Sequence, residues 1–129
     1  MNCHTHVWKG LAALEPVRSS LETGVPLVWL RVHDLPDHAY FHHGAHTQKG
    51  IGCTDCHGRV DRMHRVWQTE SLHMEWCLNC HREPERFVRP KSEAFNMEWQ
   101  RPPDQRERGR ELMADYRIER KTSCSTCHR

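Results

Sequence analysis

Three copies of one short cysteine–histidine motif are the chemically distinctive feature of this sequence. Each copy has two cysteines three residues apart and a histidine directly after them: Cys53/Cys56/His57, Cys77/Cys80/His81 and Cys124/Cys127/His128. The spacing C-x-x-C-H is the attachment signature of c-type haem. Residues three apart on a helical turn project to the same side, so both thiols can form thioethers with the two vinyl groups of one porphyrin. The next imidazole then ligates the iron, and the motifs predict three covalent haem c sites.

Two other uses of the paired cysteines stay open at this stage. Cys56 and Cys77 are separated by 20 residues, so the first two pairs also fit the count of a zinc ribbon. Zinc does not require a histidine directly after each pair, and the third pair would then lack a partner. Disulfides within the pairs would close very short loops and stabilise little. Haem attachment is therefore the interpretation that we favour.

The seventh cysteine, Cys3, indicates a fourth motif that is cut short. His4 follows it directly, and a cysteine just before Met1 would complete C-x-x-C-H. We therefore expect Met1 to be an internal methionine, with Cys3 and His4 the remnant of a truncated haem site; the alternative is a lone thiol at Cys3. Residues 1–30 also lack the basic start and apolar core of an export signal. Haem attachment normally takes place outside the bacterial cytoplasm, so this absence agrees with a missing N-terminal part.

The iron of an electron-transfer haem takes a second axial ligand, either histidine or methionine. Phe41 begins an F-x-H-x-x-H pattern in which His43 and His46 lie one helical turn apart. We predict that these two histidines ligate two different haems. Two further candidate ligands are His33 and Met74, the latter three residues before Cys77.

Two more histidines, one before this pattern and one inside it, receive a different interpretation. His38 and His42 lie in the same histidine-rich stretch, between residues 33 and 46. We interpret both as surface residues or as contacts to haem propionates.

Composition limits both the size of the fold and its partners. The chain has 129 residues, of which 36% are hydrophobic, and a mean hydropathy of −0.88. A single small domain this polar has too little apolar surface for a large enzyme core, so bound haem must supply its interior. The 19 basic and 17 acidic residues give a net charge of +2, without the basic footprint of a nucleic-acid-binding protein. The longest apolar run, residues 25–30, is far below the roughly 20 residues of a transmembrane helix.

These features predict a mainly α fold with much irregular structure, a small multihaem cytochrome c packed around covalent haems. We expect helices over residues 8–21, 35–48 and 104–121, and a short strand over residues 25–32. Three parts follow along the chain: the remnant of a truncated haem site (1–24), a two-haem core (25–82), and a loop, helix and C-terminal haem site (83–129). Because metal ligation and folding are coupled, the chain without haem should be largely unfolded.

Several haems in so short a chain predict electron transfer. A compact chain of this length has a radius of gyration of about 14 Å, so the haems lie close together and electrons pass rapidly between them. A haem with both axial positions filled cannot bind a substrate at iron, which argues against an enzyme. An enzyme of the multihaem nitrite or hydroxylamine type would need an open axial position, and a soluble shuttle cytochrome is the other alternative.

Longer runs around the motifs resemble the pentahaem cytochrome c subunit of bacterial alternative complex III, a quinol:electron-acceptor oxidoreductase. The runs are Leu30–His43, Cys53–Asp61, Met74–Arg82 and Cys124–His128, together with the incomplete motif at residues 1–4. The resemblance covers nearly the whole chain. It implies a C-terminal fragment that begins inside the second haem motif of the family, without the first haem and the N-terminal membrane anchor.

The resemblance also implies functional assignments. His57, His81, His128 and His4 match proximal ligands, His43 and His46 match the distal pair, and His33 and Met74 lie in family-like segments. Quinol would be oxidised elsewhere in the complex, beside an iron–sulfur subunit, and electrons would pass to a cytochrome c or a terminal oxidase. The chain would lie in the periplasm, associated with the membrane through the complex. The cysteine missing before Met1 departs from the family pattern and leaves at best one thioether at Cys3.

The motifs predict how much haem the protein carries. Produced with a cytochrome c maturation system, the chain should show a c-type pyridine haemochrome spectrum and a mass increased by three haems, or four if Cys3 also carries one. The mass of the bare polypeptide, or bound zinc in a colourless protein, would contradict the haem assignment.

Overall fold

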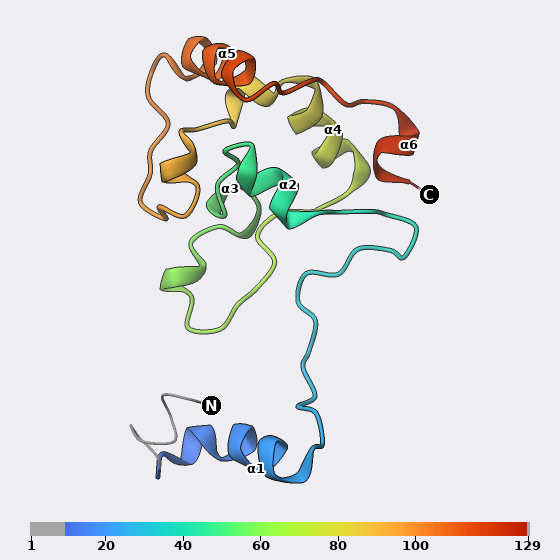
Figure 1. The fold of residues 1–129 in the computed structure, drawn as a ribbon, viewed down its shortest axis with the longest axis vertical. Helices are drawn as coiled ribbons and strands as arrows, with labels where there is room; N and C mark the ends of the chain where they lie inside the picture. The colour runs from blue at the N-terminus through green and yellow to red at the C-terminus, as the bar shows by residue number, and fades with distance from the viewer. Residues whose placement is uncertain (1–9, 129) are drawn as a thin grey trace. The chain divides into compact units, whose positions relative to one another are not determined.

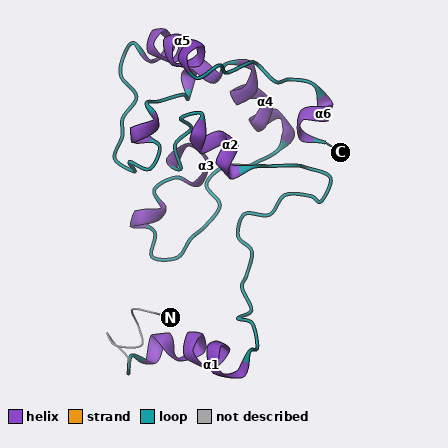
Figure 2. Cartoon of the chain, in the orientation of Figure 1, coloured by secondary structure: helices purple, strands orange, loops and turns teal. Residues whose placement is uncertain are grey.

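A computed structural model describes residues 10–128, and within this range the chain is helical with long irregular connections (Figures 1 and 2). The α-helices are α1 (Glu15–Thr23), α2 (His43–Gln48), α3 (Thr54–His57), α4 (Met74–Arg82), α5 (Gln105–Asp115) and α6 (Cys124–Cys127). Four 3-10 turns add η1 (Ala12–Leu14), η2 (Val60–Arg62), η3 (Pro84–Arg86) and η4 (Lys91–Glu93). The predicted fold class, mainly α with much irregular structure, is confirmed.

The strand expected over residues 25–32 does not form. Residues 25–30 have no regular secondary structure, and no strand occurs within residues 10–128. A strand requires a neighbour for its backbone hydrogen bonds, and Pro26 has no N–H to donate. Apolar content alone therefore did not determine the conformation of this segment.

The chain divides into two compact units between Arg31 and Val32. In the first unit, α1 begins with Glu15 and Pro16, where the missing N–H of proline costs no helical hydrogen bond. It ends at Gly24, which has a φ of 69° and adopts the left-handed conformation that favours glycine. Arg18 pairs with Glu15 one turn away. Within the described residues this helix begins later than the expected range 8–21, because the 3-10 turn η1 comes first, and residues 8 and 9 of that range lie outside the described part.

The second unit contains the three motifs and has very little apolar core. Among its described residues, Val88 and Ala94 are the buried hydrophobic side chains. The polar Gln105 is buried beside them, and its side-chain amide donates to the carbonyl oxygens of Glu85 (3.0 Å) and Val88 (2.8 Å). The polypeptide alone thus supplies a small core, built as much on hydrogen bonds as on apolar contact.

Helix α5 packs directly on η3, and a glycine allows the close approach. A Cβ atom at Gly109 would lie 2.0 Å from the carbonyl oxygen of Glu85. The buried Glu85 in turn accepts an ion pair from Arg120 (3.0 Å), which lies after α5. The expected helix over residues 104–121 is confirmed as Gln105–Asp115, so it ends six residues earlier than expected.

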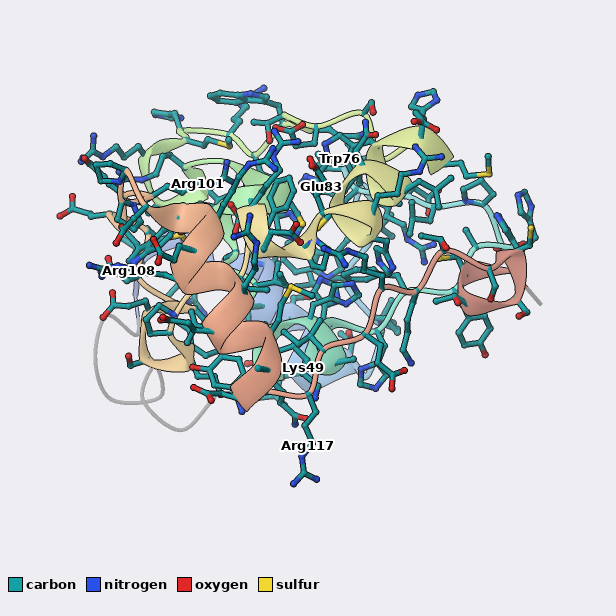
Figure 3. All side chains as sticks on the ribbon, turned by 90° about the horizontal axis from the view of Figure 1, so that it is seen from above. Lys49, Trp76, Glu83, Arg101, Arg108 and Arg117 are labelled. Carbon is teal, nitrogen blue, oxygen red and sulfur yellow. The ribbon has the colours of Figure 1, made fainter. Side chains whose placement is uncertain are left out.

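A lysine joins the histidine-bearing segment to the end of α5. Lys49, just after α2, donates to the carbonyl oxygens of Tyr116 and Arg117, and Figure 3 shows Lys49 and Arg117 at this end of the helix. The neighbouring Gly50 has a φ of 77°, and a Cβ there would lie 2.2 Å from the carbonyl oxygen of Arg89. Its own carbonyl accepts from Arg89 N at 2.9 Å. The chain between α2 and the first motif is therefore held against residue 89.

In the described part of the chain, no helix combines the length and the hydropathy that crossing a bilayer requires.

The contact at Gly109 predicts a specific loss of stability. Gly109→Ala should destabilise the haem-loaded protein, because overpacking against a backbone costs about 1–3 kcal/mol and alanine regains only about 1 kcal/mol of helix propensity. Denaturant unfolding measures the difference. Gly10→Ala is the control, since nothing lies within 4 Å of a Cβ at that position. Equal unfolding midpoints for the two variants would contradict the packing described here.

Candidate functional site

The three C-x-x-C-H motifs lie at three short helices of the second unit. α3 ends at His57, α4 contains His81, and α6 is followed directly by His128. In the first and third motifs the backbone N–H of the histidine donates to the backbone carbonyl of the motif's first cysteine, at 2.9 Å in both. The motifs lie on one or two helical turns, since α3 and α6 have four residues each and α4 has nine. Each turn places two thiols and an imidazole on one short segment.

Each motif histidine lies close to another histidine from the segment 33–46. The ring centroids of His57 and His43 are 6.1 Å apart and their planes are within 6° of parallel. The second motif has the same spacing, since the rings of His81 and His46 are 6.2 Å apart. The two histidines of the F-x-H-x-x-H pattern are thus beside two different motifs, and their ligation of two haems stays a prediction.

The third motif has a partner that the sequence interpretation missed. His38 and His128 have ring centroids 5.5 Å apart. Their segments are joined by an antiparallel bridge between Ala39 and His128, and Tyr40 N donates to the carbonyl of Cys127 at 2.6 Å. His38 was interpreted as a surface or propionate contact. Only the pairing of residues 39–40 with residues 127–128, which are distant in sequence, reveals its position.

These separations fit two imidazoles on opposite sides of one iron. An imidazole nitrogen lies about 2 Å from a bound transition metal, so the ring centroids of two such ligands are roughly 6 Å apart. The pairs on His57 and His81 match this value and the pair on His128 is slightly closer. The residues present therefore fit a haem iron with two histidine ligands at each complete motif.

In each motif histidine it is Nδ1 that has a polar partner, which leaves Nε2 free to bind a metal. His81 Nδ1 donates to the carbonyl of Lys121 at 2.8 Å, and His128 Nδ1 donates to the carbonyl of His38 at 3.2 Å. His57 Nδ1 lies 3.3 Å from His33 Nε2. In metal sites, such a partner on one ring nitrogen fixes the orientation of the ring and leaves the other nitrogen for the metal. All three motif histidines have this arrangement, in which Nε2 is the atom that would bind a metal.

Contacts within and next to helix α2 fix the positions of its two histidines, His43 and His46. Phe41 packs edge-on against His43 (4.7 Å) and stacks on His46 (4.5 Å), so one aromatic ring contacts both imidazoles. His46 Nδ1 donates to the carbonyl of His42 at 2.9 Å. His42 is the N-cap of α2, where its Nδ1 accepts from Ala45 N at 3.0 Å. The helix expected over residues 35–48 is present only as His43–Gln48.

Burial affects the protonation of two of the paired histidines. Burial lowers the pKa of His46 and His57, and the charges of neighbouring histidines lower it further, whereas the hydrogen bond to the His42 carbonyl partly offsets the shift at His46. A lowered pKa favours the neutral imidazole, the form that binds a metal.

The thiols of different motifs lie near one another. Burial raises the pKa of Cys56 to about 12, and the neighbouring Asp55, Cys80 and Cys77 add to the shift. The same cause raises the pKa of Cys80 to about 11. No disulfide joins any of the six motif cysteines. Because the thiolate is the nucleophile in disulfide formation, raised pKa values disfavour disulfides between these neighbouring sulfurs before haem is attached.

The first motif is fastened by a buried ion pair. Asp55, inside the motif, accepts from Arg89 and from Arg101, both at 2.6 Å. The Arg89 side chain is only 1% exposed, and its guanidinium lies 4.2 Å from the centre of the Trp99 ring. Gly52 N also donates to Asp55 at 3.2 Å. A charged and hydrogen-bonded clamp therefore holds the turn on which Cys53 and Cys56 stand.

The remaining predicted site residues differ in their surroundings. His33 contacts His57 and is half-buried, whereas Met74 is the first residue of α4 and is 62% exposed. Cys3 and His4 lie outside the described residues. Within residues 10–128, no three His, Cys, Asp or Glu side chains gather as a set that could hold a single bare metal ion.

Covalent haem motifs, paired imidazoles and a small polypeptide core define the class of multihaem c-type cytochromes. Residues 39–129 match the family of cytochrome c7 and related cytochrome c, and the chain belongs to this family. No curated protein matches the chain significantly. The match confirms a multihaem cytochrome c that carries covalent haem c and transfers electrons, and it places the chain among electron carriers rather than enzymes.

Haem c supplies reversible one-electron chemistry at its iron. The residues that would attach it are the thiols of Cys53, Cys56, Cys77, Cys80, Cys124 and Cys127, and those that would ligate its iron are the imidazoles of His57, His81 and His128. His43, His46 and His38 stand opposite these imidazoles and would fill the second axial positions.

The third pair yields a direct test of whether His38 is an axial ligand. In the haem-loaded protein, His38→Ala should convert one haem from a low-spin, six-coordinate to a high-spin state, because its iron loses an axial imidazole. Electron paramagnetic resonance and visible spectra measure the change. His64→Ala, at an exposed histidine outside the three pairs, should leave the spectra unchanged. A His38→Ala protein with every haem still low-spin would rule out this ligation.

Proposed function

We propose that the chain is a periplasmic electron relay with three complete haem c sites, acting within alternative complex III. It receives electrons from quinol oxidation in another part of the complex and passes them to a cytochrome c or a terminal oxidase. An iron–sulfur subunit lies alongside, and the complex holds the chain at the membrane. One observation supports the proposal that the chain relays electrons: three histidine pairs are present, and each includes the histidine of one motif.

The contacts between the motifs support an order of sites with the second motif in the middle. Cys56 of the first motif is an electrostatic neighbour of Cys77 and Cys80, and Cys77 is in turn a neighbour of Cys127 of the third motif. The carbonyl of Lys121, shortly before the third motif, accepts from His81 of the second. Sites in such an order form a continuous route from one end of the unit to the other.

The distal ligands also tie neighbouring sites together. His43 and His46 belong to the same short helix, yet they stand beside the first and the second motif respectively. Their fixed separation on α2 limits how far apart the two sites can move. A rigid spacing favours electron transfer at a constant rate, because no domain movement is needed between the two sites.

Assignment to alternative complex III is supported by the runs around the motifs. Leu30–His43 leads into the paired histidines, and Cys53–Asp61 and Met74–Arg82 carry the first two motifs. These runs resemble the pentahaem subunit more specifically than the motifs alone do. The family match extends over residues 39–129 and supports the multihaem part of this proposal.

Purification of the native complex tests the assignment. The tagged full-length protein should remain in the membrane fraction, be extracted with mild detergent together with an iron–sulfur subunit, and become reduced when quinol is added. Release into the periplasmic fraction as a single haem protein would favour a soluble shuttle cytochrome instead. Extraction with a nitrite-reducing or hydroxylamine-oxidising activity would contradict the relay.

A further inference from the structure

We propose that His33 is the hydrogen-bond acceptor of the first motif's histidine and sets the potential of that haem, rather than being one of its axial ligands. The inference rests on the proposed function insofar as it requires a haem iron bound to His57. It concerns one side chain that approaches the motif from a different segment of the second unit.

The geometry separates the two histidines beside His57. His33 meets His57 edge-on, with ring centroids 4.4 Å apart and planes at 80°. Two imidazoles on one iron have centroids roughly 6 Å apart, because each ligating nitrogen lies about 2 Å from the metal. His43, at 6.1 Å from His57, has this separation, and His33 is too close for it. The structure therefore assigns the opposite axial position to His43.

The atoms in contact are those of a supporting hydrogen bond. His33 Nε2 lies 3.3 Å from His57 Nδ1. When Nε2 of His57 binds a metal, its proton is on Nδ1, so Nδ1 is the donor and His33 Nε2 must accept. His33 is then neutral and carries its own proton on Nδ1. Both side chains are half-buried, which limits competition from water for this bond.

The first motif differs from the other two in the group that faces Nδ1 of its histidine. His81 and His128 donate from the same nitrogen to main-chain carbonyls, of Lys121 and His38. At the first motif, a side chain takes the place of the carbonyl. The acceptor strength at this site therefore depends on the identity of residue 33, whereas at the other two sites a substitution leaves the carbonyl in place.

The hydrogen bond has a defined electronic effect. An acceptor on Nδ1 raises the basicity of a ligating imidazole, and a more basic ligand stabilises the oxidised iron. Hydrogen bonding around the ligands is one of the means by which a protein adjusts haem potential. His33 should therefore lower the potential of the haem at Cys53 and Cys56 relative to a protein without this acceptor.

Three variants of the haem-loaded protein test the assignment. His33→Phe removes the acceptor, His33→Gln retains a side-chain acceptor, and His43→Ala removes the opposite imidazole. Electron paramagnetic resonance gives the spin state of each haem, and a spectroscopic redox titration gives the potentials. His33→Phe should leave all haems low-spin and raise the potential of one, and His33→Gln should restore much of the difference. His43→Ala should make one haem high-spin.

Two results would overturn the inference. A high-spin haem in His33→Phe, with His43→Ala still fully low-spin, would make His33 the axial ligand. Unchanged potentials in His33→Phe would mean that the contact has no electronic role. Haem content and circular dichroism, equal to those of the parent protein, confirm that the variants are folded. Failure of the proposed function is distinguishable, because membrane association and quinol-dependent reduction are measured on the unaltered protein.

Discussion

Pairing between distant imidazoles is the constraint on which the second unit depends. The motif histidines at 57, 81 and 128 each face a histidine from the segment 38–46, at centroid separations of 5.5–6.2 Å. Iron coordination at such pairs would link segments separated by up to 90 residues. An ordinary domain of this size makes those links through a hydrophobic core, whereas here the buried apolar residues of the described chain are Val88, Ala94 and Pro84. Ligation energy and the apolar faces of the porphyrins would supply the stabilisation that the polypeptide lacks.

Local aromatic, hydrogen-bond and ion-pair contacts of the polypeptide position these histidine pairs. Phe41 holds both histidines of α2, and His42 caps that helix so that it starts at the required residue. The Arg89–Asp55 ion pair lies under the first motif and is almost completely buried. A buried ion pair contributes weakly to stability in comparison with well-packed apolar side chains, but breaking one is costly. Its value here is geometric, since it fixes the turn that carries Cys53 and Cys56.

Supporting contacts around the ligands distinguish three motifs that are identical in pattern. Two motif histidines donate to main-chain carbonyls and the third faces the side chain of His33. Their solvent exposure and charged neighbours also differ, with Asp55 beside the thiols of the first and second motifs. Haem potential depends on burial, charge and hydrogen bonds as well as on axial ligands. Sites with equal ligand types can therefore have different potentials, which gives a relay its direction.

The sequence by itself determined the chemistry: thiol pairs next to a histidine require no tertiary information, because all three groups lie on one helical turn. It also predicted His43 and His46 as partners of the motifs, since residues three apart on one helix project to the same side. It did not predict His38, whose position depends on the bridge between Ala39 and His128, or the contact of His33 with His57. A helix presents its own neighbours at fixed spacing, whereas a contact between distant segments depends on the path of the whole chain. The tertiary structure alone decided which imidazole faces which, and thus which of the many histidines stand opposite a motif.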